Sequence, residues 1–165
     1  MSLRALDSAA FGFPTSCFVC DPDNSRGLRL LFFHDEDAAL VTAEFTLGNE
    51  FSGAPQYVHG GVVLAVVDDA MAWAAIAVAG RFAVVRETTT TFEHGVRLGR
   101  PHRVEARVES QTTRVLNASA RVINQEGKRC ARSKARLVFL TESGARSAIG
   151  EVGGEDTRFL RKEPT

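Results

Sequence analysis

The sequence of 165 residues has little of what marks specialised protein classes, with three cysteines, five prolines, one tryptophan and one tyrosine. An odd number of cysteines, without the spacing of a disulfide framework, favours a reducing compartment, so we expect a cytoplasmic protein. Repeats and low-complexity blocks are lacking as well. The length suits one domain, and the 44% of hydrophobic residues can build its core.

An excess of charge is also absent, because twenty basic residues balance twenty acidic ones. Whole-chain charge therefore gives no argument for nucleic acid or an anionic membrane as a partner, and any anion site has to be local. The N-terminus lacks a continuous hydrophobic region, and the long apolar run 62–78 is broken by Asp68 and Asp69. We expect a soluble, unexported protein with no nucleic-acid or membrane partner.

Alternating apolar and charged residues predict most of the strands. In 101–111, Val104 and Ala106 point to one face while Arg103 and Glu105 point to the other. Turn residues at 34–37 and 124–127 separate neighbouring strands. We expect strands at 28–34, 39–46, 82–92, 101–111, 113–124 and 128–141, with a loop at 47–58.

Residues 60–79 are apolar nearly all round, which predicts a helix buried on most sides and stopped by Gly80. A short helix is expected near Leu3–Ala10. One long helix among strands joined by short turns predicts an α+β fold with an antiparallel sheet. We divide the chain into an irregular segment 1–27, a domain 28–141 and a disordered tail 142–165 that docks through Phe159 and Leu160.

Two glycines open the long helix, directly after a histidine. A helix N-terminus presents free amide hydrogens, and glycines let a substrate oxygen approach them closely. Gly60 and Gly61 are therefore candidate donors to an oxyanion, with His59 shaping the entry to the pocket. The alternative is a loop-to-helix turn that binds nothing.

Asp68 lies eight residues after Gly60, or about 12 Å along the helix, which is too far to act on a carbonyl held at that amide. Two chains packed with antiparallel helices would bring these groups together, so the acid predicts a two-fold dimer. Asp69 is rotated by about 100° and is expected at a sheet edge, reaching solvent or hydrogen-bonded. The alternative for Asp68 is a structural buried acid. The stripe expected at the contact comprises Gly61, Ala65, Asp68, Ala72 and Ala75.

Cys17 and Cys20 have the spacing of half a zinc site or a redox pair. A tetrahedral site needs four ligands, and only His34 and Cys130 are loose candidates to complete it. We therefore expect two small packed residues and no metal site.

A basic stretch lies near the end of the domain, where Arg132, Lys134 and Arg136 alternate onto one strand face. A solvated outer face of the sheet is the simpler interpretation. The alternative is a docking surface for the phosphates of a nucleotide-bearing substrate, with Arg132 and Lys134 as substrate-binding residues.

The stretch His59-Gly60-Gly61, followed by Asp68-Asp69-Ala70-Met71, resembles the signature of the hotdog-fold acyl-CoA thioesterases of the phenylacetate pathway (PaaI type). Cys17-Phe18-Val19-Cys20, with Asn24 and Gly27-Leu28, is similar to an N-terminal motif of one subgroup, although Asp21 replaces the expected glycine. The resemblance covers about residues 17–140.

This resemblance implies a hotdog fold, in which an antiparallel sheet of about six strands wraps around one long central helix. It implies a homodimer or dimer of dimers that hydrolyses an acyl-CoA thioester, with no cofactor. The Gly60 amide would be the oxyanion donor, and Asp68 of the opposite subunit the base or nucleophile. Gly61 and Gln56 are expected to contact the substrate.

Three positions depart from the family pattern. Gly53 stands where relatives often carry an amide side chain that Gln56 might replace, while Ala72 and Val85 stand where some relatives carry hydroxyls. The alternative function is therefore a non-catalytic hotdog module that binds acyl-CoA. A hydratase or dehydratase is less favoured, because His34, His94 and His102 lie in no pattern typical of that chemistry.

Overall fold

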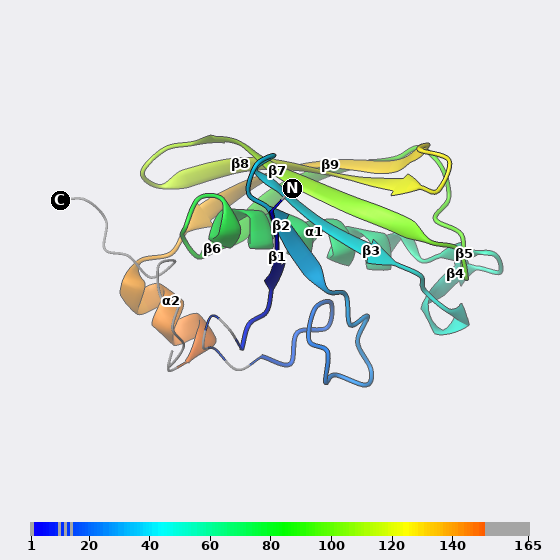
Figure 1. Cartoon of the computed structure of the whole chain (residues 1–165), viewed down its shortest axis with the longest axis horizontal. Helices are drawn as coiled ribbons and strands as arrows, with labels where there is room; N and C mark the ends of the chain where they lie inside the picture. The colour runs from blue at the N-terminus through cyan, green and yellow to red at the C-terminus, as the bar shows by residue number, and fades with distance from the viewer. Residues whose placement is uncertain (1, 10, 12, 14, 151–165) are drawn as a thin grey trace.

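The computed structural model describes residues 2–9, 11, 13 and 15–150. Within them, seven strands form one antiparallel sheet that curves around a long helix, α1 (Gly60–Ala77), as Figure 1 shows. The predicted α+β fold with one central helix is confirmed, with one strand more than the six expected. The strands, in their order across the sheet, are β1 (Leu3–Leu6), β2 (Phe32–Asp35), β3 (Leu40–Phe45), β7 (His102–Gln111), β8 (Val115–Asn124), β9 (Arg129–Phe139) and β6 (Ala83–Phe92).

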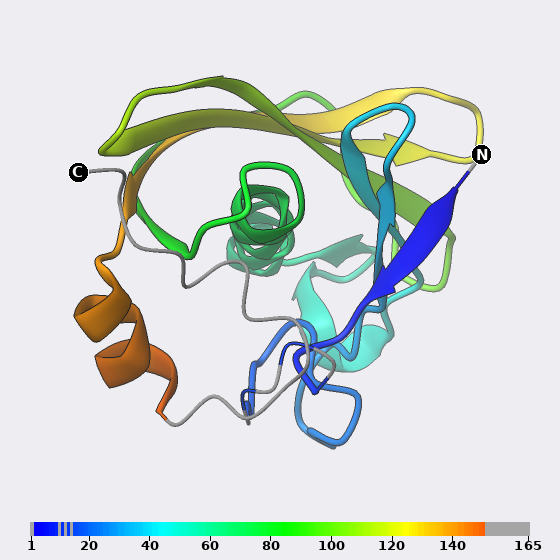
Figure 2. The same ribbon diagram turned by 60° about the vertical axis from the view of Figure 1, so that its left-hand side comes forward.

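The core lies between α1 and the concave face of the sheet. In the view along the helix, the strands arch over α1 and descend on both sides of it (Figure 2). Val66 and Ala70 of the helix are fully buried, as are Val104 and Leu137 of the sheet. By length and composition α1 could span a membrane, but half of its residues are buried in the protein, as in the core helix of a globular domain. Burial of this apolar surface is the main force that holds the fold together.

The N-terminal segment departs from the prediction. The short helix expected near Leu3–Ala10 is wrong over Leu3–Leu6, which form β1 and pair antiparallel with β2. The strand expected at 28–34 begins only at Phe32, because the Leu28 and Leu30 amides donate to carbonyls of the N-terminal loop at 2.7 and 2.8 Å. Long-range pairing decides the structure of both segments, and local sequence patterns do not contain it.

The segment predicted as a loop at 47–58 contains a 3₁₀ turn (Asn49–Phe51) and a small hairpin of β4 (Ser52–Ala54) and β5 (Tyr57–Val58). Backbone hydrogen bonds tie this segment to the residue that caps α1 and to the loop before β7. The His59 amide donates to the Phe51 carbonyl at 2.8 Å, and the Val58 amide donates to the Val96 carbonyl at 2.8 Å. The segment therefore sets the point at which α1 begins.

The end of the described chain also differs from the prediction. Glu142–Ile149 form a helix, α2, where we expected a disordered tail. Thr141 caps it, because its hydroxyl accepts a hydrogen bond from the Gly144 amide at 3.1 Å. The predicted docking residues Phe159 and Leu160 lie outside the described residues. At the end of α1, Gly80 has a φ of +70°, as its predicted role as a helix stop requires.

Candidate functional site

The first turn of α1 leaves one amide available. His59 caps the helix, and its Nδ1 accepts a hydrogen bond from the Gly61 amide at 2.9 Å. The Gly60 amide makes no hydrogen bond to any residue in the described ranges. Of the two glycines predicted to hold an oxyanion, Gly60 therefore has the free donor, and Gly61 is engaged by the histidine.

The hairpin β4–β5 positions His59 through a close backbone contact at Gly53. A Cβ atom at Gly53 would lie 2.8 Å from the His59 Cα, so no side chain fits there. The amide side chain that relatives often carry at this position is thus excluded by the packing of this chain. Gln56, its suggested substitute, is exposed, and its carbonyl accepts a hydrogen bond from the Leu98 amide at 3.1 Å.

An exposed aromatic residue stands beside the free amide. A Cβ atom at Gly60 would lie 3.5 Å from Cζ of Phe92, which ends β6 and is 52% exposed. Phe92 therefore forms one wall of the approach to the Gly60 amide. The sequence did not predict that Phe92 lies beside Gly60, because no spacing relates residue 92 to residue 60.

Asp68 lies on the exposed side of α1, two turns after Gly60. Its carboxylate makes no hydrogen bond or ion pair with the described residues, and burial of its surroundings raises its pKa above the usual value. Ala65 and Ala72, on the same stripe, are partly exposed, whereas Ala75 is fully buried. The predicted contact stripe is thus accessible to solvent from Gly61 to Ala72 and buried at Ala75.

Asp69 lies in a different place from the one expected. It packs against the N-terminal loop, where the Cys17 thiol donates a hydrogen bond to its Oδ1 at 3.6 Å, and not at a sheet edge. Burial and the neighbouring Cys17 raise the pKa of Asp69 to about 7. The two adjacent carboxylates therefore lie in separate surroundings, as the rotation of about 100° between them around the helix predicted.

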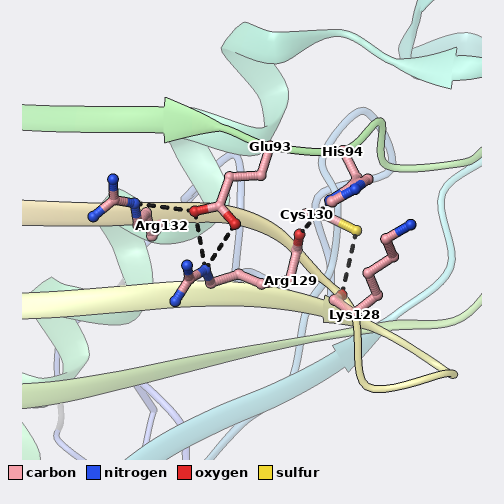
Figure 3. A network of polar contacts seen from close by, with 6 residues as sticks. All are labelled: Glu93, His94, Lys128, Arg129, Cys130 and Arg132. Carbon is pink, nitrogen blue, oxygen red and sulfur yellow. Dashed lines mark hydrogen bonds and ion pairs between the residues drawn. The ribbon is translucent and has the colours of Figure 1, made fainter.

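The basic residues of β9 lie on the outer face of the sheet, away from α1. Figure 3 shows the Glu93 carboxylate between two guanidinium groups, with the Arg132 Nε 3.0 Å from Oε1 and the Arg129 Nε 3.0 Å from both oxygens. The hydrogen bond from Arg129 lowers the pKa of Glu93. His94 Nδ1 donates to the Arg129 carbonyl at 2.9 Å and ties the strand end to the same cluster.

Arg132 and Lys134 also line a groove of about 680 Å³ on this outer face. Glu105 is buried at the groove, paired with Arg121 at 2.7 Å and with Arg103 at 2.9 Å. Because the groove and α1 lie on opposite faces of the sheet, a single chain does not bring Arg132 and Lys134 to Gly60 and Asp68. Their role as substrate-binding residues stays a prediction.

The central part of the sequence resembles a known protein family. A sequence model of the thioesterase superfamily matches residues 55–131, from the turn before β5 to the first residues of β9. A comparison with curated protein sequences found no match.

Solved structures share the fold. A thioesterase superfamily protein superposes with a TM-score of 0.66 and 21% identity, over 71% of this chain and 57% of its own, so this chain spans little more than half its length. The PaaI protein of the Escherichia coli phenylacetic acid degradation operon superposes with a TM-score of 0.57 and 22% identity, over 60% of this chain and 75% of its own. A Streptococcus mutans protein solved with acetyl-CoA bound superposes with a TM-score of 0.59 and 16% identity, over 62% of this chain and 82% of its own.

The chain therefore has the hotdog fold, and its central segment matches the sequence model of the thioesterase superfamily. The resemblance to hotdog-fold thioesterases, PaaI among them, is confirmed. At these identities the solved structures establish the fold, and the activity has to be argued from the site itself.

Proposed function

We propose that this protein is an acyl-CoA thioesterase. One observation carries the proposal: a helix N-terminus with a free Gly60 amide shares the exposed side of α1 with Asp68, an acid that has no partner among the described residues. A lone donor and a lone acid are the two groups that thioester hydrolysis requires of a protein.

The Gly60 amide and the positive end of the helix dipole would stabilise the negative charge that develops on the thioester carbonyl oxygen. Asp68 would take a proton from a water molecule that adds to the carbonyl carbon. Alternatively, Asp68 would itself attack the carbonyl carbon and form an acyl–Asp68 anhydride, which water hydrolyses after CoA has left. The carbon–sulfur bond then breaks, and the thiolate of CoA takes up a proton. The products are a carboxylic acid and free CoA.

The proposed site needs two chains. Gly60 and Asp68 are separated by eight residues of one helix, or about 12 Å, so one chain does not bring both to one carbonyl. The edge strand β6 and the open stripe from Gly61 to Ala72 support an antiparallel pairing of two chains, in which Asp68 of one faces Gly60 of the other. A two-fold axis then creates two identical sites.

The ligand class is supported by the acetyl-CoA held by the Streptococcus mutans protein, which shares the fold. In our proposal the outer groove with Arg132 and Lys134 receives CoA phosphates from the neighbouring chain of the assembly. The acyl group would lie beside Phe92, at the free amide.

The decisive test is thiol release from a panel of short, medium, long and aromatic acyl-CoAs. We expect wild-type protein to hydrolyse at least one class, and Asp68→Asn to reduce kcat by about 100-fold or more. Glu36→Gln, which removes an exposed acid at the β2–β3 turn, is the matched control and should leave the rate unchanged. Equal rates in wild type and Asp68→Asn would refute the proposal.

The second candidate is a module that binds acyl-CoA without hydrolysing it. It is favoured by Gly53, whose contact with His59 leaves no room for an amide side chain, and by Ala72 and Val85, which lack hydroxyls. Calorimetric binding of a non-hydrolysable acyl-CoA analogue, without thiol release from any member of the panel, would select this candidate.

A further inference from the structure

Three side chains that could bind a metal converge beneath α1. Cys17 and Cys20 come from the N-terminal loop, and Asp69 comes from the middle of the helix, 52 residues after Cys17. The Cys17 Sγ lies 3.6 Å from the Asp69 Oδ1, and one donor atom from each residue lies within 4.8 Å of the other two. In Figure 2, the loop lies on the side of α1 that the sheet does not cover.

The loop holds Cys17 in a form that suits a metal ligand. The backbone amides of Val19 and Cys20 both donate hydrogen bonds to the Cys17 sulfur at 3.3 Å. Such amide donors also stabilise a metal-bound thiolate, which is the form of cysteine that binds metals.

Asp69 has an oxygen that the protein leaves unsatisfied. Its Oδ2 is fully buried and has no hydrogen-bond partner in the part of the chain that the structure describes. No basic side chain of the described residues forms an ion pair with it. A buried carboxylate oxygen without a partner is costly, and a bound cation would supply the missing partner.

The separation of Cys17 and Asp69 fits a tetrahedral zinc site. With zinc–sulfur bonds of about 2.3 Å and zinc–oxygen bonds of about 2.1 Å, a tetrahedral angle places sulfur and oxygen about 3.6 Å apart. This matches the separation of the Cys17 Sγ and the Asp69 Oδ1. Two cysteine sulfurs among the ligands favour a thiophilic ion such as Zn²⁺ over Mg²⁺ or Ca²⁺.

We propose that Cys17, Cys20 and Asp69 form a site for one thiophilic divalent cation, best suited to Zn²⁺, that ties the N-terminal loop to the core helix. The three protein ligands leave a fourth position for water or a small ligand. The sequence predicted no metal site, because only Cys17 and Cys20 have the spacing of ligands and His34 and Cys130 were loose candidates to complete the set. The third is Asp69, which only folding brings to the cysteines.

A disulfide between Cys17 and Cys20 explains the arrangement less well. It would consume the thiol hydrogen bond to Asp69 and leave both carboxylate oxygens without a partner in the described structure. A cation uses all three groups, and the proposed metal site predicts that the thiols stay reduced.

The test is a titration of the full-length protein, reduced and stripped with a chelator. Zn²⁺ is added in competition with a chromophoric chelator, and Co²⁺ serves as a spectroscopic probe because thiolate-to-cobalt charge transfer reports sulfur ligands. We expect one equivalent per chain, with thiolate bands in the Co²⁺ spectrum and a higher Tm after Zn²⁺ is added. A wild-type protein that binds no Zn²⁺ in this competition overturns the proposal.

The variants assign the ligands. Cys17→Ser, Cys20→Ser and Asp69→Asn should each weaken Zn²⁺ binding by about 100-fold or more, because each removes one ligand. Matched controls are Cys130→Ser, which removes a buried thiol on β9, and Asp68→Asn, which removes the adjacent carboxylate; both should keep full stoichiometry. Circular dichroism confirms that each variant is folded, and the wild-type Co²⁺ spectrum reports the ligands if one is not.

Two other outcomes also contradict the proposal. Zn²⁺ binding that survives Asp69→Asn without loss excludes the carboxylate as a ligand. A Cys17–Cys20 disulfide that forms in the purified protein, found by mass spectrometry after thiol blocking, together with no Zn²⁺ binding after reduction, identifies a redox pair instead. Neither outcome bears on thioester hydrolysis, whose test uses Asp68.

Discussion

At the scale of single residues, two glycines near α1 have opposite reasons to be glycine. A side chain at Gly53 would collide with the backbone of His59, whereas one at Gly60 would make an ordinary contact with Phe92 at 3.5 Å. Gly53 is therefore required by packing. Gly60 is compatible with a side chain, and its small size serves the approach to its own amide.

This difference gives a paired prediction. Gly53→Ala should lower the free energy of unfolding by about 1–3 kcal/mol, because the added atom forces the hairpin away from α1. Gly60→Ala should change it by less than about 1 kcal/mol, yet reduce thioesterase activity by crowding the amide beside Phe92. Urea denaturation and thiol release measure the two effects. Equal loss of stability in both variants would contradict this account.

The raised pKa of Asp68 predicts the pH dependence of the reaction. A general base acts in its ionised form, so kcat/KM should fall as the pH drops through the pKa of Asp68, with a midpoint above the usual 3.8. The residual activity of Asp68→Asn should lack this step. Circular dichroism at each pH separates it from acid unfolding. A wild-type profile that rises toward acid would contradict Asp68 as the base.

At the scale of the element, α1 combines two tasks on one helix. Its inner residues fill the core under the sheet, while its outer stripe and N-terminus stay open for the site. An apolar helix with little amphipathic pattern suits this arrangement, because strands surround it on three sides, and the N-terminal loop and a proposed second chain share the fourth.

Truncations on the two sides of α1 should therefore differ in cost. Met71 is 1% exposed, so Met71→Ala should lower the free energy of unfolding by about 2–5 kcal/mol through loss of burial and a cavity. Leu64 is partly exposed on the chain, and Leu64→Ala should cost less than about 2 kcal/mol. Urea unfolding of both variants at one protein concentration measures the two losses of free energy of unfolding. Equal losses would show that Leu64 lies in a buried contact.

At the scale of the whole molecule, the proposed chemistry depends on assembly. The sheet has an unpaired edge at β6, and the small residues Ala65 and Ala72 flank Asp68 on the open side of α1. Small side chains allow two helices to approach closely, and a two-fold arrangement uses the same surface on both chains.

A bulky charge on this surface should separate the chains. Ala65→Arg is expected to convert a dimer into monomers and to abolish thioesterase activity together with it, since Asp68 and Gly60 would no longer meet. Light scattering coupled to size exclusion measures the mass, and Glu36→Gln again serves as control. A monomeric wild-type protein with full activity would exclude the two-chain site.

Patterns in the chain were enough to predict the long helix at 60–79, which ends at Ala77 in the structure, the strands that follow it and the turn at 124–127. These elements depend on local periodicity and on turn residues such as Gly80 and Gly127, whose φ values are positive in the structure. The spacing from His59 to Asp68 was likewise sufficient to place a donor and an acid on one helix.

Only the tertiary structure decided which groups have partners. It turned Leu3–Leu6 into a strand, engaged Gly61 with His59 while leaving Gly60 free, and brought Asp69 to Cys17 across 52 residues. These outcomes depend on contacts between segments far apart in the chain. Local propensity carries no information about such contacts, because their energy arises only once the core has packed.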